Sequence, residues 1–185
     1  MAEQVNVNGS TASLIAAAKS GGKGPPPVHL WDPPYCGEID IVIKRDGTWI
    51  HEGTPIGRLG LVRLFASVLK REGDRYFLVT PVEKLGLQVE DAPFVAVDFE
   101  VADGDITFST NVGDLVTAGP DHPIRVELGP DGEPSPYIEV RRGLEALIDR
   151  KSFYRLVEIG ETEGDVFGVR SGGAFFPMIE AAALE

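Results

Sequence analysis

Hydrophobic and polar residues alternate in several short segments of this chain. Apolar side chains occupy every second position in two of these segments: Ile39, Ile41, Ile43 and Leu85, Leu87, Val89. A period of two predicts β-strands with one buried face, because successive side chains of a strand point to opposite sides. Asp-Gly pairs at residues 46–47, 103–104 and 131–132 each lie between strand-like segments. Since Asp-Gly favours tight turns, we expect three β-hairpins.

Two other segments, residues 55–71 and about 140–151, have the apolar spacing typical of a helix. Thr54 is expected to cap the first helix, with Pro55 as its first residue. Gly57 and Arg58 would then stand in the first turn, where glycine costs about 1 kcal/mol relative to alanine and an arginine faces the positive end of the helix dipole. Because such conflicts with local preference often mark functional positions, this turn is a candidate site.

Parts of the sequence resemble one another. Three pairs of segments match: 39–47 (IDIVIKRDG) with 124–132 (IRVELGPDG), 58–61 (RLGL) with 141–144 (RRGL), and 76–79 (YFLV) with 154–157 (YRLV). Because the matches recur in the same order, duplication is favoured over a coincidence between ordinary amphipathic elements. We therefore predict an α+β fold with mostly antiparallel sheets, in which a module of β-hairpin, helix and strand occurs twice.

The beginning of the chain is expected to stand apart from these modules. Ser10 or Thr11 could cap a short apolar helix there. The following GGKGPPP segment indicates a linker, because its lysine is not followed by Ser or Thr and a proline run replaces the helix that a phosphate-binding loop requires. We predict an N-terminal helical appendage and linker at residues 1–27, a first half at 28–110 and a second half at 111–185.

Charge and composition exclude several classes of partner. The formal net charge of −12, from 29 acidic and 17 basic residues, repels nucleic acids and anionic membranes, so neither is an expected partner. A single cysteine, Cys36, and the lack of a long apolar run favour a cytoplasmic protein. The three histidines lack zinc-ligand spacing and no serine stands in a Gly-x-Ser-x-Gly motif, so we predict no metal, cofactor or catalytic residue. Ser171, followed by two glycines, is expected in a turn.

Longer motifs indicate a family. The segments GEIDIVIKRDGTWIHEGTPIGR, LVRLFASVL, YFLVTPVEK and VEDAPF resemble a bacterial family known as domain of unknown function DUF1285, and the resemblance continues through RRGLEALIDRKSFYRLVE and SGGAFFP. The resemblance implies a duplicated α+β core and a C-terminal half similar to pleckstrin-homology folds. It also implies a site between the halves for a nucleotide-like ligand, and a role in signalling.

Arg58 and Arg141 are the first candidates for ligand binding. The internal alignment places both near the start of a predicted helix, where free amide groups and a guanidinium could together hold a phosphate or carboxylate. Gly57 would allow a ligand to approach the backbone closely. Alternatively, each arginine pairs with a structural carboxylate, and the candidates are Glu52, Glu83, Asp91 and Glu139.

Trp49, His51 and Glu83 are the other candidates. Trp49 and His51 should project to the same side of a strand, where a flat ring could stack on a base and an imidazole could form a hydrogen bond. The alternative is that the tryptophan covers the core and the histidine is structural. Glu83 is expected at a turn before a strand, where it could orient Arg58 or could simply be a solvated turn residue.

Together these patterns favour a small cytoplasmic ligand-binding or sensor protein for an anionic, nucleotide-like ligand. An enzyme acting on a phosphorylated or carboxylated small molecule is one alternative. A protein-interaction module that uses an exposed sheet edge is another.

Overall fold

A computed structural model describes residues 7–19 and 24–184 of the chain. Its secondary structure is mostly β, with three α-helices among these residues. The chain forms two compact units, which divide after Glu90. We expected the first half to extend to residue 110, but the strands of residues 94–110 pair within the sheet of the second unit.

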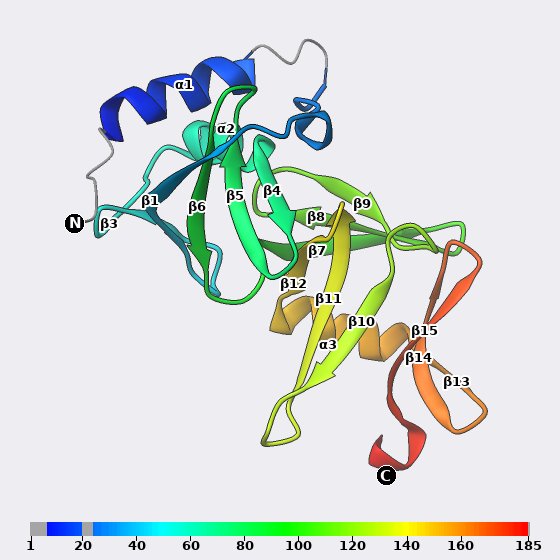
Figure 1. Cartoon of the computed structure of the whole chain (residues 1–185). Coiled ribbons are helices and arrows are strands. Elements are labelled where there is room, and N and C mark those ends of the chain that lie inside the picture. The colour runs from blue at the N-terminus through cyan, green and yellow to red at the C-terminus, as the bar shows by residue number, and fades with distance from the viewer. Residues whose placement is uncertain (1–6, 20–23, 185) are drawn as a thin grey trace. The chain divides into compact units, whose positions relative to one another are not determined.

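The first unit contains three helical segments and one six-stranded sheet. Its elements are α1 (Val7–Lys19), the 3₁₀ turn η1 (Val28–Leu30), β1 (Tyr35–Ile43), β2 (Trp49–His51), β3 (Thr54–Pro55), α2 (Leu59–Ser67), β4 (Leu69–Glu72), β5 (Arg75–Val79) and β6 (Lys84–Val89). The strand order is β3-β2-β1-β6-β5-β4, and the helices α1 and α2 pack against each other (Figure 1). Strands β1 and β6 are parallel, and every other neighbouring pair in this sheet is antiparallel.

The period-two prediction is confirmed in β1 and β6. The side chains of Ile39, Ile41 and Ile43 are at most 6% exposed, and Leu85 and Leu87 are also buried. The hairpin at Asp46-Gly47 joins β1 to β2, and Asp46 Oδ1 accepts a hydrogen bond from the Thr48 amide.

The helix prediction for residues 55–71 was wrong at both ends, because α2 ends at Ser67 and residues 69–71 belong to β4. Thr54 and Pro55 pair with β2 as the short strand β3, and α2 begins only at Leu59. Arg58 is therefore the N-cap of the helix, and Gly57 precedes it. The N-cap signal of Thr54 is local, whereas the pairing with β2 depends on the preceding turn, in which Glu52 and Gly53 both have positive φ.

In the N-terminal segment, α1 spans Val7–Lys19, so residues 10 and 11 lie inside the helix and not at the position before its first residue, as expected for a cap. The first three residues of the GGKG motif lie outside the described residues.

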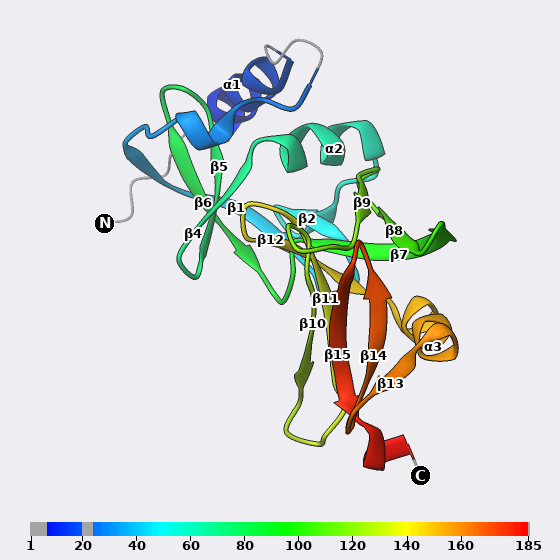
Figure 2. The ribbon, with the colours of Figure 1, turned by 90° about the vertical axis from the view of Figure 1, so that its right-hand side faces the viewer.

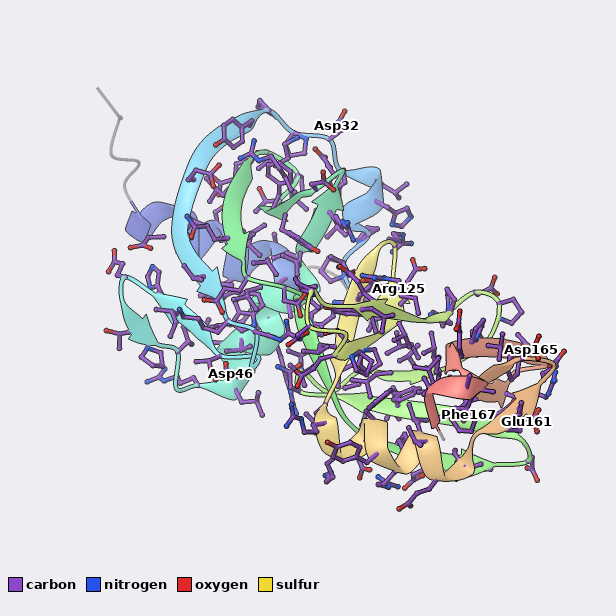
Figure 3. The ribbon with its side chains drawn as sticks, turned by 90° about the horizontal axis from the view of Figure 1, so that it is seen from below. Asp32, Asp46, Arg125, Glu161, Asp165 and Phe167 are labelled. Carbon is purple, nitrogen blue, oxygen red and sulfur yellow. The ribbon has the colours of Figure 1, made fainter. Side chains whose placement is uncertain are left out.

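The second unit contains a six-stranded sheet, a three-stranded sheet and one α-helix. Its elements are β7 (Phe94–Ala102), β8 (Asp105–Thr110), β9 (Leu115–Thr117), β10 (Ile124–Leu128), β11 (Pro134–Arg141), β12 (Leu144–Ile148), α3 (Arg150–Ile159), β13 (Glu161–Glu163), β14 (Val166–Ser171), β15 (Ala174–Glu180) and the 3₁₀ turn η2 (Ala181–Leu184). The helix α3 contacts β7 and β14, and Figure 2 shows it beside the small sheet. Figure 3 labels Glu161 and Phe167 on that sheet.

The two six-stranded sheets have the same topology. Each sheet consists of two meanders of three strands: β1–β3 and β4–β6 in the first sheet, and β7–β9 and β10–β12 in the second. The two meanders are joined by a parallel pair, which is β1 with β6 in the first sheet and β7 with β12 in the second. Thus β1 and β6 correspond to β7 and β12. The chain therefore consists of two repeated halves, as predicted.

The residue-level alignment that led to this prediction pairs strands that are not equivalent. It matches β1 with β10, whereas β10 occupies the position of β4 in the topology. It also expects a helix at residues 140–151, where the chain forms the end of β11, the strand β12 and only then α3. Residues 154–157, matched to strand β5, lie in α3. The hairpins at Asp103-Gly104 and Asp131-Gly132 are present as predicted.

Candidate functional site

The segment from β2 to the start of α2, residues 49–60, contains four of the predicted site residues, and we call it the β2–α2 corner. Trp49 pairs with Ile43 and His51 pairs with Ile41, so both side chains lie on the face of the sheet that those isoleucines bury. The backbone then reverses, and the Ile56 amide donates a hydrogen bond to the Trp49 carbonyl over 2.9 Å. This bond holds the residues that precede α2 alongside β2.

Trp49 belongs to the core of the first unit. Its side chain is 1% exposed and its ring stacks on Phe65 of α2, with 6.5 Å between the ring centroids and 25° between the planes. This packing corresponds to the core role that we considered as the alternative to base stacking. The indole Nε1 is buried and has no hydrogen-bond partner among the described residues. A buried donor that stays unpaired costs about 1–3 kcal/mol.

His51 shows the same feature two residues later. Its side chain is half-buried, and its Nε2 atom is buried without a hydrogen-bond partner in the described part of the chain. The indole nitrogen can only donate, whereas an imidazole nitrogen can donate or accept. The corner thus contains two neighbouring ring nitrogens whose hydrogen-bonding capacity is unused.

Arg58 lies at the exposed end of this corner. It has an extended backbone with φ −94° and ψ 103°, and its carbonyl accepts hydrogen bonds from the amides of Leu61 and Val62. No side chain caps the helix, and the Arg58 guanidinium has no ion-pair partner among residues 7–19 and 24–184. A cation and the free amides of the first helical turn therefore lie at the same end of α2.

Gly57 and Gly60 flank this position. A Cβ atom added to either glycine would meet no atom within 4 Å, so packing does not require glycine there. Their lack of side chains instead leaves the backbone amides at the start of α2 accessible from solvent.

Arg141 is placed differently from Arg58. It is the last residue of β11 and not near a helix start, because the tight turn at Arg142-Gly143 follows it, with φ 43° and 77°. Its guanidinium donates to Asp114 Oδ2 over 2.8 Å and lies 5.1 Å from the centre of the Phe94 ring. This is a structural ion pair, although Asp114 was not among the carboxylates that we proposed as partners.

Glu83 follows a turn, as predicted. Thr80 Oγ1 accepts hydrogen bonds from the amides of Val82 and Glu83, and β6 begins at the next residue, Lys84. Glu83 is half-buried, and its Oε1 atom is buried without a partner among the described residues. Because Lys84 pairs with Tyr35 at the beginning of β1, Glu83 lies at the opposite end of that strand from the residues that pair with Trp49 and His51.

The other face of the same sheet carries a charged cluster that the sequence analysis missed. The Glu38 carboxylate lies directly over Gly86, since a Cβ atom added there would be 2.3 Å from Glu38 Oε1. Glu38 accepts hydrogen bonds from the Tyr35 hydroxyl and the Arg75 guanidinium, which lies 5.0 Å from the centre of the Phe77 ring. An isolated glycine inside a strand often marks such a close approach, so Gly86 was the available signal.

Next to this cluster is an open groove of about 690 Å³. It is lined by residues of β1, β5, β6 and the adjoining turns: Glu38, Val42, Lys44, Asp74, Arg75, Tyr76, Leu87, Gln88, Val89 and Glu90. Lys44 and Glu90 form an ion pair over 2.9 Å. The hydrogen bond from Lys44, with a second one from the Arg45 amide, holds the pKa of Glu90 below its ordinary value.

Ser171 of the second unit is a structural residue. It ends β14, its side chain is fully buried, and two glycines with positive φ form the turn that follows. The hydroxyl donates to the Ala118 carbonyl and accepts from the Ile106 amide, both over 2.8 Å. The Ser171 hydroxyl therefore both donates and accepts a hydrogen bond within the fold.

The described residues contain no group of three or more His, Cys, Asp or Glu side chains that could hold a metal ion. None of their helices is both long and apolar enough to span a membrane.

Comparison with known proteins identifies the family. The family model for the N-terminal domain of DUF1285, a domain of unknown function, matches residues 26–92, and the model for the C-terminal domain matches residues 93–178. No functionally curated protein matches the chain.

Two solved structures are similar to this chain. A DUF1285 family protein from Silicibacter pomeroyi DSS-3 is 58% identical with a TM-score of 0.87, and the alignment covers 92% of this chain and 97% of that one. A DUF1285 family protein from Shewanella baltica OS155 is 36% identical with a TM-score of 0.53, and the alignment covers 65% of this chain and 91% of that one. The boundary between the matched domains lies close to the division of the two compact units. The chain therefore belongs to the DUF1285 family.

Proposed function

We propose that this protein is a small ligand-binding or sensor protein whose first unit holds the anionic group of a nucleotide-like ligand at the β2–α2 corner. The observation that carries the proposal is Arg58, an exposed arginine with no ion-pair partner among the described residues at the uncapped start of a helix. Arg63 on the same helix is also exposed without an ion pair, so what distinguishes Arg58 is its position beside the free amides of the helix start. A free guanidinium beside free helix amides is suited to bind phosphate or carboxylate oxygens.

The buried nitrogens of Trp49 and His51 are a second, independent observation. Each is an unsatisfied polar group, and each becomes satisfied if a ligand or a bound water supplies a hydrogen-bond partner. Because the Trp49 ring is buried against Phe65, the proposal assigns it no stacking role in this conformation. Arg141 has its own carboxylate partner and is omitted from the site.

Signalling requires a further step. A ligand changes the conformation of a sensor only if it binds two states with different affinities, and the short loop between β3 and α2 is the element that would respond. Three points stay predictions. They are a contribution of the second half to the site, the similarity of that half to pleckstrin-homology folds, and a cytoplasmic location of the protein.

Calorimetric titration tests the proposal. The probes are inorganic phosphate, AMP, ATP and a cyclic dinucleotide, and the variant is Arg58→Ala. A charge-assisted hydrogen bond contributes about 1.5–3 kcal/mol, so we expect Arg58→Ala to weaken binding about tenfold or more.

Arg63→Ala is the matched control. Arg63 is exposed on the same helix and has no ion-pair partner among the described residues. The Arg63→Ala variant removes the same charge as Arg58→Ala, so it should change the affinity for each probe by less than about twofold. Absence of binding by every probe, or equal losses in the two variants, would contradict the proposal.

A further inference from the structure

The groove beside Glu38 in the first unit differs in chemistry from the β2–α2 corner. Its floor contains Val42 of β1 and Gln88 of β6, which are paired across the two parallel strands. Between the pairs Glu38–Gly86 and Val42–Gln88 the strand β1 contains more residues than β6, so the register shifts there. Such a bulge bends a strand and opens space beside its neighbour.

Both cations of the groove are already neutralised. Arg75 is paired with Glu38, and Lys44 is paired with Glu90 over 2.9 Å. An anionic ligand would therefore have to displace a carboxylate from one of them. A third carboxylate, that of Asp74 on the β4–β5 turn, has no ion-pair partner among the described residues. The lining residues thus have one uncompensated negative charge.

One other group of the lining complements a cation. The Gln88 amide is exposed, makes no hydrogen bond within the described ranges and has a carbonyl oxygen that can accept one. The ring of Tyr76, another residue of the lining, already lies 5.5 Å from the Arg71 guanidinium, so it is not assigned to the ligand. A volume of about 690 Å³ lies within the range of small-molecule sites.

We propose that this groove binds a small organic cation that carries a primary amine or guanidinium group. Asp74 supplies the charge and Gln88 accepts a hydrogen bond. The inference is independent of the anion site, because it rests on different residues.

Nuclear magnetic resonance of the full chain tests the inference, with putrescine and L-arginine amide as probes. We expect saturable shifts of the Gln88 backbone and side-chain amides. Asp74→Asn should weaken binding about threefold, which lies within the range for an exposed charge pair. Asp32→Asn is the matched control, because Asp32 is an exposed carboxylate outside the groove (Figure 3) with no ion pair among the described residues.

Three outcomes would overturn the inference. The first is the absence of saturable shifts at Gln88 with either probe. The second is an equal weakening by Asp74→Asn and Asp32→Asn. The third is saturable shifts at Gln88 with inorganic phosphate but not with the amines, since these would show that the groove prefers an anion.

Discussion

Two serines of the second unit allow the cost of a buried hydrogen bond to be measured directly. Ser171 and Ser152 are both fully buried, but the Ser171 hydroxyl makes two hydrogen bonds and the Ser152 hydroxyl makes none with described residues. Substitution of either by alanine removes the same single oxygen. The two variants therefore differ in the hydrogen bonds that are lost and hardly in the volume that is removed.

The magnitude follows from the groups that each variant leaves unpaired. Ser171→Ala removes the partner of the Ile106 amide and one partner of the Ala118 carbonyl. Each buried unpaired group costs about 1–3 kcal/mol, so the variant should lose about 2–5 kcal/mol of unfolding free energy. For a unit of this size that corresponds to a melting temperature at least about 8 °C lower. Ser152→Ala should be neutral or slightly stabilising, because it removes an unsatisfied hydroxyl.

Urea unfolding followed by far-ultraviolet circular dichroism measures the difference, and hydrogen exchange at the Ile106 amide locates it in the second unit. Faster exchange of that amide is expected in Ser171→Ala only. Equal stability of the two variants, or a larger loss in Ser152→Ala, would refute the reasoning from hydrogen-bond satisfaction.

Three further predictions concern packing, capping and pH. Gly168→Ala should destabilise the second unit by more than about 2 kcal/mol in urea unfolding, because the added Cβ atom would lie 2.1 Å from a backbone oxygen of β15. Gly57→Ala should change stability by less than about 0.5 kcal/mol, because a Cβ atom added there meets no atom within 4 Å. Asp149→Ala should cost about 1 kcal/mol by thermal unfolding, because it removes the N-cap of α3, and Asp149→Asn should restore most of that loss. The hydrogen bond from Lys84 holds the pKa of Glu72 below its ordinary value of 4.5. The ionised Glu72 carboxylate therefore stabilises the fold above that pH, and this stabilisation is lost as the pH falls through the lowered pKa. Glu72→Gln should make the free energy of unfolding less dependent on pH between about 5 and 3, and an unchanged slope would contradict this.

The strands and hairpins could be predicted because their signals are local. Alternation of Ile39, Ile41 and Ile43 and the Asp-Gly turns reflect the strand period and the turn geometry, which do not depend on distant residues. The same alternation was present in β12, where Leu144 and Ala146 are buried. Assignment of that segment to a helix was therefore an error in reading the period.

The start of α2 and the second arginine site could not be predicted in this way. Thr54 has the chemistry of an N-cap, but its pairing with β2 prevails over that preference. Arg141 and its partner Asp114 are distant in sequence and meet only when β9 and β11 take their places in one sheet. The common face of Trp49 and His51 did follow from their spacing, whereas the burial of the tryptophan depends on α2.

The central claim is that Arg58 holds an anion at the start of α2. Nitrogen-15 spectra of the arginine side chains, recorded during titration with inorganic phosphate and then with AMP, test it most directly. The account predicts a saturable shift of the Arg58 Nε resonance that exceeds the shift of Arg63. Equal, non-saturating shifts of both resonances, or no shift of Arg58, would contradict it.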